Sequence, residues 1–282
     1  MSLADAVASA LGQPVERVTP VDGGCTSETG RVDLVGGDTV FAKAADGLPG
    51  GMLDVEADGL RWLGEVPGVR VPTVLAVTPG ALVLGWIPPG PRGPGTDEDL
   101  GGQVARLHAA GAPSFGWWRD GFIGREPQRN MPGAADWPTF WVEHRIAPLT
   151  VRAVAAGAMD RRARALVDRL RSRLPDLAGP DEPPARVHGD LWSGNVHVDA
   201  QGRPWLVDPA PYGGHREVDL AMLHLFGTPG PGVVAAYDEL FPLAPGWRDR
   251  LPLWQLEPLL VHAVMFGGSY GASALAVLDR FT

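Results

Sequence analysis

The first third of the chain mixes two kinds of apolar pattern. Residues 30–44 and 69–87 contain short runs rich in valine, leucine and alanine, which is typical of β-strands. Between them, residues 52–66 place apolar side chains three and four positions apart, and this spacing predicts a helix that packs by one face. Residues 1–12 also read as a short amphipathic helix. This part of the chain is therefore predicted to be a small α+β unit.

The pattern changes after residues 88–96, a connector rich in proline and glycine. Helical periodicity dominates the rest, except around residues 186–209, where a strand, a turn and a second strand are predicted. The chain therefore divides into two predicted units, 1–87 and 88–282, of which the second is mostly helical. The helices of this second unit are expected over 97–111, 137–157, 160–174, 215–227 and 251–268.

The composition is that of a folded, soluble protein. Of its 282 residues, 45% are hydrophobic and 20% are charged, an ordinary balance for an enzyme. The net charge of −9 argues against a nucleic-acid partner, because such surfaces are normally basic. The longest apolar run, 74–87, is too short to cross a bilayer, and the first residues lack the basic start of a signal peptide. We expect a cytoplasmic protein with no membrane partner. The single cysteine, Cys25, excludes an internal disulfide.

Candidate chemistry is concentrated in residues 188–208. The segment "HGDLWSGNV" places Asp190 and Asn195 five positions apart, and an apolar run ends at Asp208. Phosphoryl transfer from a nucleotide requires a carboxylate beside the acceptor hydroxyl and hard oxygen ligands for Mg²⁺. The spacing D-x-x-x-x-N matches a kinase catalytic loop. Asp190 is the expected base, and Asn195 and Asp208 are the expected metal ligands, although each short motif alone is also explained by turn formation.

A kinase also needs groups that hold the phosphates, and the first unit contains candidates. Lys43 is the only lysine of the chain. Its ammonium is a compact point charge with rotatable donors, whereas the guanidinium of the arginines found elsewhere is planar. Glu56, on the helix predicted over 52–66, is the expected partner of this lysine. The glycine-rich segment 22–30 is the expected phosphate-binding loop, although a plain hairpin would have a similar composition. Its candidate contacts are Gly23, Gly24, Cys25, Thr26 and Ser27.

Three segments resemble the fructosamine kinase family (ketosamine-3-kinases), a branch of the aminoglycoside-phosphotransferase and protein-kinase-like group. They are "HGDLWSGNV" at 188–196, "DPAPYGGHREVDLAMLHLFG" at 208–227 and "FGWWRDGFIGREPQRN" at 115–130. The resemblance implies a bilobal protein kinase-like fold with a small antiparallel-sheet lobe and a larger helical lobe. It also implies ATP- and Mg²⁺-dependent phosphorylation of the sugar O3 of a fructosamine or ribulosamine, a step of deglycation repair.

The resemblance also assigns roles to residues. Lys43 and Glu56 match the phosphate-binding ion pair, and Asp219 is expected to brace the catalytic loop. The backbone between the lobes, including Leu84, Trp86 and Ile87, matches the hinge that holds adenine. The expected substrate contacts are Trp192, His215, Arg216, Glu217 and His262; a buried structural aromatic is the alternative for Trp192, and a core histidine for His262.

There are two alternatives to a ketosamine kinase: a kinase that acts on another acceptor, and a binding module without catalytic activity. A kinase of aminoglycosides, choline or homoserine would share all the catalytic groups named above, and only residues 115–124 and 215–222 favour a ketosamine. A binding module is disfavoured because the base, the metal ligands and the lysine are all present. Cys25 lies in the glycine-rich segment, where backbone N–H groups would favour a reactive thiolate; a small apolar filler is the alternative for this side chain. The chain is therefore expected to be a monomer, or a homodimer joined through Cys25.

Overall fold

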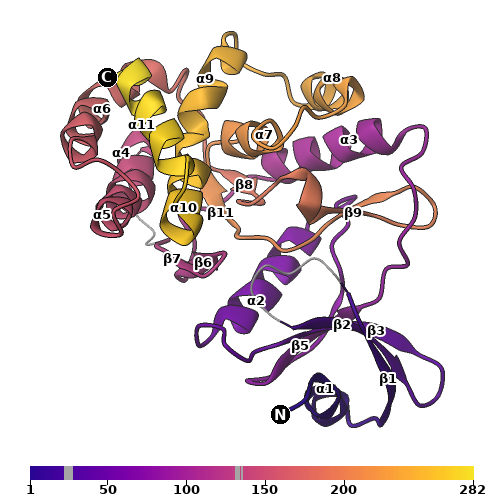
Figure 1. Cartoon of the computed structure of the whole chain (residues 1–282). Helices are drawn as coiled ribbons and strands as arrows, with labels where there is room; N and C mark the ends of the chain where they lie inside the picture. The colour runs from indigo at the N-terminus through magenta and orange to yellow at the C-terminus, as the bar shows by residue number, and fades with distance from the viewer. Residues whose placement is uncertain (22–27, 131–133, 135) are drawn as a thin grey trace.

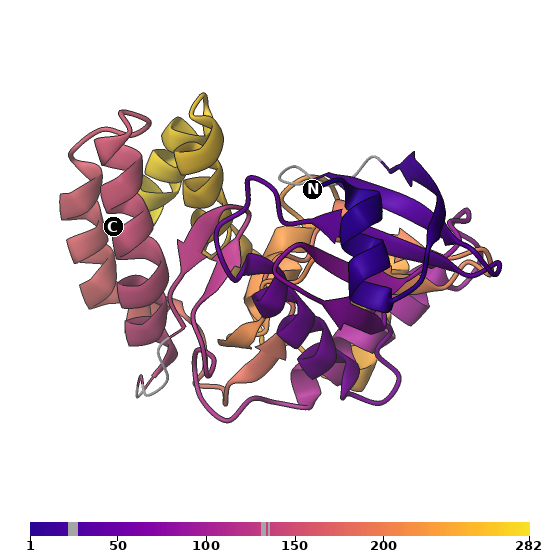
Figure 2. The ribbon, with the colours of Figure 1, turned by 90° about the horizontal axis from the view of Figure 1, so that it is seen from below.

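The chain folds into two lobes of unequal size. The computed structural model describes residues 1–21, 28–130, 134 and 136–282. A sheet flanked by helices α1 and α2 forms the N-terminal lobe, and a larger, mostly helical lobe lies beside it (Figure 1). Seen from below, the N-terminal sheet and the helices α5 and α6 lie at opposite ends of the molecule (Figure 2). The bilobal α+β fold expected from the sequence is confirmed.

The sheet of the N-terminal lobe is antiparallel and has the strand order β1-β2-β3-β5-β4. One helix packs on each of its faces, α1 with one set of apolar strand residues and α2 with the other. The strands are β1 (Val15–Pro20), β2 (Thr29–Leu34), β3 (Thr39–Ala44), β4 (Val74–Val77) and β5 (Ala81–Gly85), and the helices are α1 (Leu3–Leu11) and α2 (Met52–Gly64).

The alternation of side chains along β3 determines where Lys43 points. Val40 and Ala42 are buried in the cluster that contains Leu3 and Val7 of α1. Successive residues of a strand face opposite sides of the sheet. Lys43 therefore lies on the face covered by α2, the helix that carries its expected partner.

Ten helical segments of at least five residues, one three-residue 3₁₀ turn (Ser193–Asn195) and six short strands make up the described part of the C-terminal lobe. The strands pair as the hairpins β6–β7 and β9–β10 and as the pair β8–β11. The helices are α3 (Thr96–Ala109), α4 (Trp137–Trp141), a π-helical turn (Val142–Ile146), α5 (Ala147–Ala155), α6 (Ala163–Leu177), α7 (Glu217–Leu223), α8 (Pro231–Leu240), α9 (Trp247–Trp254), α10 (Leu256–Phe266) and α11 (Tyr270–Phe281), and the strands are β6 (Gly121–Ile123), β7 (Glu126–Gln128), β8 (Ala185–Val187), β9 (Val196–Val198), β10 (Pro204–Leu206) and β11 (Tyr212–Gly214).

Two of these helices were not expected. Helix α8 follows a segment rich in glycine and proline, and α11 follows a pair of glycines, so that local sequence favours loops in both places. Tertiary packing stabilises them instead, because Tyr237 of α8 and Ala274 and Leu278 of α11 are fully buried. None of the helices within the described residues is long and apolar enough to cross a membrane.

The connection between the lobes is held against the hairpin β9–β10. Residues 86–95 run from the end of β5 to the start of α3. Within this connection, the N–H of Gly90 donates to the carbonyl of Val198 at 2.9 Å. A Cβ atom on Gly90 would lie 2.4 Å from the carbonyl oxygen of Asp199, so this close approach requires glycine. The hinge is thereby tied to the hairpin that lies between Asn195 and Asp208.

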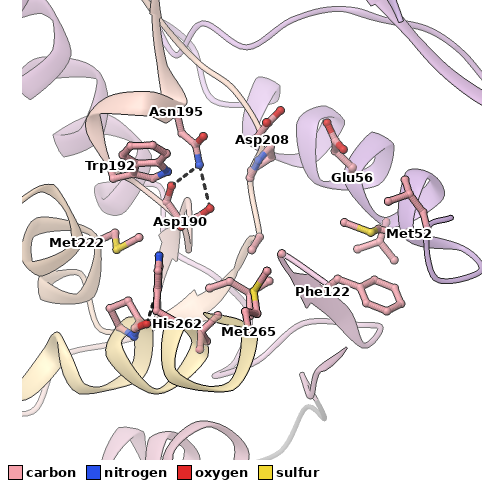
Figure 3. Close-up of a pocket in the computed structure, with 18 of the residues that line it drawn as sticks. Met52, Glu56, Phe122, Asp190, Trp192, Asn195, Asp208, Met222, His262 and Met265 are labelled. Carbon is pink, nitrogen blue, oxygen red and sulfur yellow. Dashed lines mark hydrogen bonds between the residues drawn. The ribbon is translucent and has the colours of Figure 1, made fainter. Parts of the chain in front are cut away.

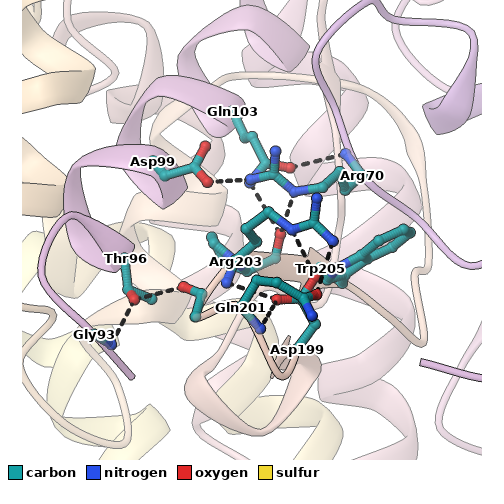
Figure 4. Close-up of polar contacts among 11 residues, drawn as sticks. Arg70, Gly93, Thr96, Asp99, Gln103, Asp199, Gln201, Arg203 and Trp205 are labelled. Atoms are coloured by element: carbon teal, nitrogen blue, oxygen red, sulfur yellow. Dashed lines mark hydrogen bonds and ion pairs between the residues drawn. The ribbon is translucent and has the colours of Figure 1, made fainter. Parts of the chain in front are cut away.

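A second link between the lobes runs through Arg70, which precedes β4 (Figure 4). Its Nε donates to the carbonyl of Pro204 in β10 at 3.0 Å, and its backbone N–H donates to Oε1 of Gln103 at 2.8 Å. The guanidinium also pairs with Asp99 of α3. The N-terminal sheet is thus attached to the larger lobe at two separate places.

Candidate active site

The loop after β8 brings Asp190 and Asn195 together, as the sequence predicts. The Asn195 side chain is 6% exposed, and its Nδ2 donates to the Asp190 carbonyl at 2.8 Å and to Oδ2 of the Asp190 carboxylate at 3.0 Å (Figure 3). These two hydrogen bonds fix the direction of the carboxylate. They also leave the Asn195 side-chain oxygen available for another contact.

Asp219 braces the catalytic loop, as expected from the sequence. Its carboxylate is 1% exposed and accepts the backbone N–H groups of His188 at 2.7 Å and Gly189 at 2.9 Å. The same carboxylate contacts Nε2 of His108 at 3.0 Å, and Nδ1 of His108 lies 2.8 Å from the hydroxyl of Tyr237. The partners of Asp219 lower its pKa, although burial alone would raise it. His108 and Tyr237 were not singled out from the sequence, since they lie far from the motif along the chain.

His188 connects the catalytic loop to the segment that carries Asp208. Burial lowers the pKa of its imidazole, which favours the neutral ring. Its Nε2 lies 3.0 Å from the carbonyl of Val207, and its Nδ1 lies 3.3 Å from the backbone N–H of Asp190. A neutral ring that carries its proton on Nε2 satisfies both contacts. The first residue of the HGD motif is therefore a structural link rather than a reacting group.

Asp208 is held in an uncommon backbone conformation. Its φ is 52°, and it is the only non-glycine residue with positive φ in the described part of the chain. Aspartate tolerates this left-handed region better than most residues, and such conformations concentrate at functional sites. The conformation accompanies a direct ion pair between Asp208 and Lys43 of the other lobe.

The ion pair expected between Lys43 and Glu56 is present. The Lys43 ammonium lies 2.7 Å from Oε1 of Glu56 and also pairs with Asp208. Burial alone would lower the pKa of Lys43, but the two carboxylates outweigh it and raise this pKa above its ordinary value. The neighbouring acid Asp58 pairs with Arg119 instead. The single lysine of the chain thus joins the N-terminal lobe to the catalytic segment.

Two cavities meet at this ion pair. One has a volume of about 430 Å³ and lies against the hinge, and the other has a volume of about 420 Å³ and contains Asp190. Lys43 and Asp208 line both cavities. Cavities of this size suit small-molecule ligands, so two ligands can approach the Lys43–Asp208 pair from different sides. We refer to them as the hinge cavity and the acceptor cavity.

The hinge cavity contains the residues expected to hold a nucleotide base. Leu84, Trp86 and Ile87 line it, together with His197 of β9. His197 was not expected from the sequence, and its Nε2 lies 3.0 Å from the carbonyl of Ile87. The glycine-rich candidates Gly23, Gly24, Cys25, Thr26 and Ser27 lie outside the described residues, so their phosphate contacts stay a prediction.

The acceptor cavity contains two of the five expected substrate residues, Trp192 and His262. The Trp192 indole folds back over Gly194, where a Cβ atom would lie 2.3 Å from the ring. Most of the other lining residues were not expected, because apolar side chains on separate elements give no joint signal in the sequence. They include Met52, Phe122, Met222, Phe226, Met265 and Phe266.

The other three expected substrate residues, His215, Arg216 and Glu217, line neither cavity in the described part of the chain. They were expected near Asp208 because they follow it closely in sequence, but β11 lies between Asp208 and α7. All three side chains are buried in contacts within the larger lobe. His215 stacks on Trp254 with ring centroids 5.3 Å apart, Arg216 pairs with Glu182, and Glu217 accepts hydrogen bonds from Arg250 and Trp254. This placement corrects the expectation of substrate contact.

We expect Glu217→Gln to lower stability without changing acceptor binding. The Glu217 carboxylate is fully buried and pairs with Arg250 at 2.6 Å, so the substitution leaves a charged partner poorly compensated and costs about 1–3 kcal/mol. Thermal unfolding should show a lower midpoint, while the KM for the acceptor stays within about twofold of the wild type. A large rise in KM with unchanged stability would restore Glu217 to the binding site.

The polar residues at the junction of the cavities fit a magnesium–nucleotide complex. Asn195 and Asp208 offer amide and carboxylate oxygens, the hard ligands that Mg²⁺ prefers. Among the described residues, no group of three or more histidine, cysteine or acidic side chains is placed to hold a metal ion. Mg²⁺ is commonly bound by one or two carboxylates and by substrate phosphates, and this donor set is of that kind.

Comparison with known proteins agrees with this geometry. The model of the fructosamine kinase family matches residues 1–282. A probable ketoamine kinase from Enterococcus faecium is 37% identical over 270 residues, which cover 94% of this chain and 95% of that protein. A chloroplastic protein-ribulosamine 3-kinase from rice (Oryza sativa subsp. japonica) is 29% identical over 297 residues, covering 98% of this chain and 85% of that protein.

A solved structure shows the same similarity in three dimensions. It comes from Thermobifida fusca, is described as a putative fructosamine-3-kinase, and is 42% identical to this chain, with a TM-score of 0.91. The match covers 99% of this chain and 98% of that one. The chain therefore belongs to the fructosamine kinase family, and the similarity extends over both of its lobes.

Proposed function

We propose that the protein is an ATP-dependent kinase that phosphorylates the sugar O3 of ketosamines, the fructosamine or ribulosamine adducts of amines. The observation that carries the proposal is the junction of the two cavities at Lys43 and Asp208, with Asp190 on the acceptor side. The names of the similar proteins, ketoamine kinase and protein-ribulosamine 3-kinase, support this class of acceptor.

In the proposed reaction, Asp190 accepts the proton of the sugar hydroxyl while the hydroxyl oxygen bonds to the terminal phosphorus of ATP. The bond from that phosphorus to the departing ADP oxygen breaks in the same step. Lys43 holds the phosphates by charge, and Asn195 and Asp208 would hold Mg²⁺, which neutralises the phosphate oxygens. Asn195 also keeps the Asp190 carboxylate in place through its 3.0 Å hydrogen bond.

The activity is expected to fall as the pH drops below neutrality. Burial, together with the charges of Asp208, Asp219 and Glu257, raises the pKa of Asp190 to about 7, and the hydrogen bond from Asn195 opposes this rise. A base acts only when ionised, so kcat/KM should decrease about tenfold per pH unit well below this pKa. Bound Mg²⁺ moves this limb to lower pH. The pH profile of kcat/KM tests this, and a profile that stays flat from pH 8 down to the pH at which the protein unfolds would contradict it.

The decisive test of the function is the release of ADP from ATP and Mg²⁺ with a panel of acceptors. The panel contains fructosyl-lysine, ribulosyl-lysine, an aminoglycoside, choline and homoserine. Turnover of the ketosamines, with phosphate found on O3 by NMR, is the expected result. Turnover of another acceptor alone would keep the catalytic mechanism and overturn the substrate, and ATP binding without any turnover would favour a binding module.

A further inference from the structure

The acceptor cavity carries its charge at one end only. Its charged lining residues within the described chain are Lys43, Glu56, Asp190 and Asp208. The proposed reaction uses three of them, and the fourth, Glu56, is paired with Lys43. No arginine and no second lysine lines this cavity among the residues described. A carboxylate on the substituent of the substrate amine would therefore have no cationic side chain with which to form an ion pair.

The mouth of the same cavity presents aromatic rings to solvent. Phe226 and Phe266 are 41% and 57% exposed, and their rings lie 5.0 and 5.5 Å from the imidazole of His262. The indole of Trp192 is 5.8 Å from Phe226, and the ring of Tyr270 is 5.0 Å from His262. All five rings line the cavity, so they form one continuous aromatic rim.

This rim is assembled from separate elements. Phe226 follows α7, Phe266 is the last residue of α10, and Tyr270 is the first residue of α11. Exposed aromatic groups are unfavourable in water, and a cluster of them beside a cavity marks a place where a ligand is bound. The rim continues inward to Met222 and Met265, whose flexible apolar side chains also line the cavity.

His262 adds a polar group to this rim. Its Nδ1 lies 2.8 Å from the carbonyl of Pro258, a contact that requires a proton on Nδ1. The other ring nitrogen points into the cavity on the side of Asp190 (Figure 3). In the neutral ring this nitrogen accepts a hydrogen bond, so it suits a sugar hydroxyl and the surrounding rings suit an apolar group.

We infer that the enzyme prefers ketosamines whose amine carries an uncharged methylene chain or aromatic group, which packs against Phe226 and Phe266 while the sugar lies toward Asp190. This inference rests on the proposed function and specifies its substrate. An alkylamine and the side chain of a lysine within a protein both provide such a methylene chain.

The test compares ketosamines that share one sugar and differ only in the amine. The amines are methylamine, butylamine, 4-aminobutyrate and 1,4-diaminobutane. The butylamine adduct should have a kcat/KM at least about 10-fold above that of the methylamine adduct, because added methylenes are buried against the rim. The 4-aminobutyrate adduct should lose most of this advantage, because no cation lines the rim among the residues described. The 1,4-diaminobutane adduct should not exceed the butylamine adduct, because its ammonium loses hydration against the rings. A fifth adduct, of Nα-acetyl-lysine N-methylamide, separates the two sources of the chain: equal or better turnover than butylamine indicates protein lysine, and poorer turnover indicates free alkylamines.

Variants show whether the rim is responsible. Phe226→Ala and Phe266→Ala should each reduce the butylamine-to-methylamine ratio of kcat/KM to about threefold or less. Leu240→Ala is the matched control, because Leu240 is 55% exposed and does not line the cavity, and it should keep the wild-type ratio. A ratio is insensitive to a loss of folded protein, since both adducts are measured on the same preparation.

The outcomes separate this inference from the function on which it rests. Turnover of the methylamine adduct without preference for butylamine, or a preference for 4-aminobutyrate, would overturn the inference and keep the ketosamine kinase. An unchanged ratio in both phenylalanine variants would overturn the role of the rim. Absence of turnover with every adduct would overturn the proposed function itself.

Discussion

Asp190→Asn is expected to lower kcat/KM for the ketosamine by about 10²- to 10⁴-fold, the usual contribution of a general base. The substitution keeps the size of the side chain and removes only its ability to accept the proton. Substrate binding should change little, so the loss should appear in kcat rather than in KM. The matched control is Asp168→Asn on α6, where the carboxylate is 71% exposed and pairs with Arg171, and this variant should keep the wild-type rate.

The same variant is expected to be more stable than the wild type above pH 7. The folded-state pKa of Asp190, about 7, is higher than its ordinary value of 3.8, so ionisation of this carboxyl is more difficult in the folded protein than in the unfolded chain. The resulting destabilisation is absent below about pH 4, grows as the pH rises toward 7 and is complete above it. Thermal unfolding without nucleotide or Mg²⁺ should therefore give a higher midpoint for Asp190→Asn at pH 8 and nearly equal midpoints at pH 4. Equal midpoints at pH 8 would show that the carboxylate is better solvated than the structure indicates.

Lys43→Met is expected to lower kcat by about 10²- to 10³-fold, the range found when one group that stabilises transition-state charge is removed. Its ammonium is the only cation that lines both cavities among the residues described. The change also leaves the carboxylates of Glu56 and Asp208 without their shared partner, which should cost up to about 3 kcal/mol of stability. Activity and unfolding are both measured, at a temperature where the variant is folded.

A double variant separates the two effects of losing Lys43. In Lys43→Met/Glu56→Leu one of the unpaired carboxylates is replaced by an apolar side chain of similar size, so much of the stability should return. The catalytic rate should remain as low as in the single variant, because the group that holds the phosphates is still missing. Recovery of the rate together with stability would show that Lys43 acts only through the fold.

The sequence predicted the site best where interacting groups lie in one short segment. Asp190 and Asn195 share one loop, so their spacing along the chain already determines their approach in space. Lys43 and Glu56 could be paired because the only lysine of the chain precedes a helix with a clear apolar face. The roles of these residues in phosphoryl transfer remain predictions that the variants above test.

Sequence order was misleading where the chain changes direction. His215, Arg216 and Glu217 follow Asp208 closely, but β11 separates them from it and their side chains are buried elsewhere. The aromatic rim was missed for the opposite reason, since Phe226 and Phe266 are distant in sequence and meet only in the fold. Each directly precedes a glycine, a weak signal that becomes meaningful only once both rings are seen to lie against His262.

The single lysine has a consequence for an enzyme proposed to act on glycated amines. Sugars condense with unprotonated, accessible amines, and the Lys43 side chain is 8% exposed and paired with two carboxylates. A charged, enclosed ammonium is a poor nucleophile toward a sugar aldehyde. The side chains of the protein thus offer almost no target for the damage that the proposed reaction would reverse.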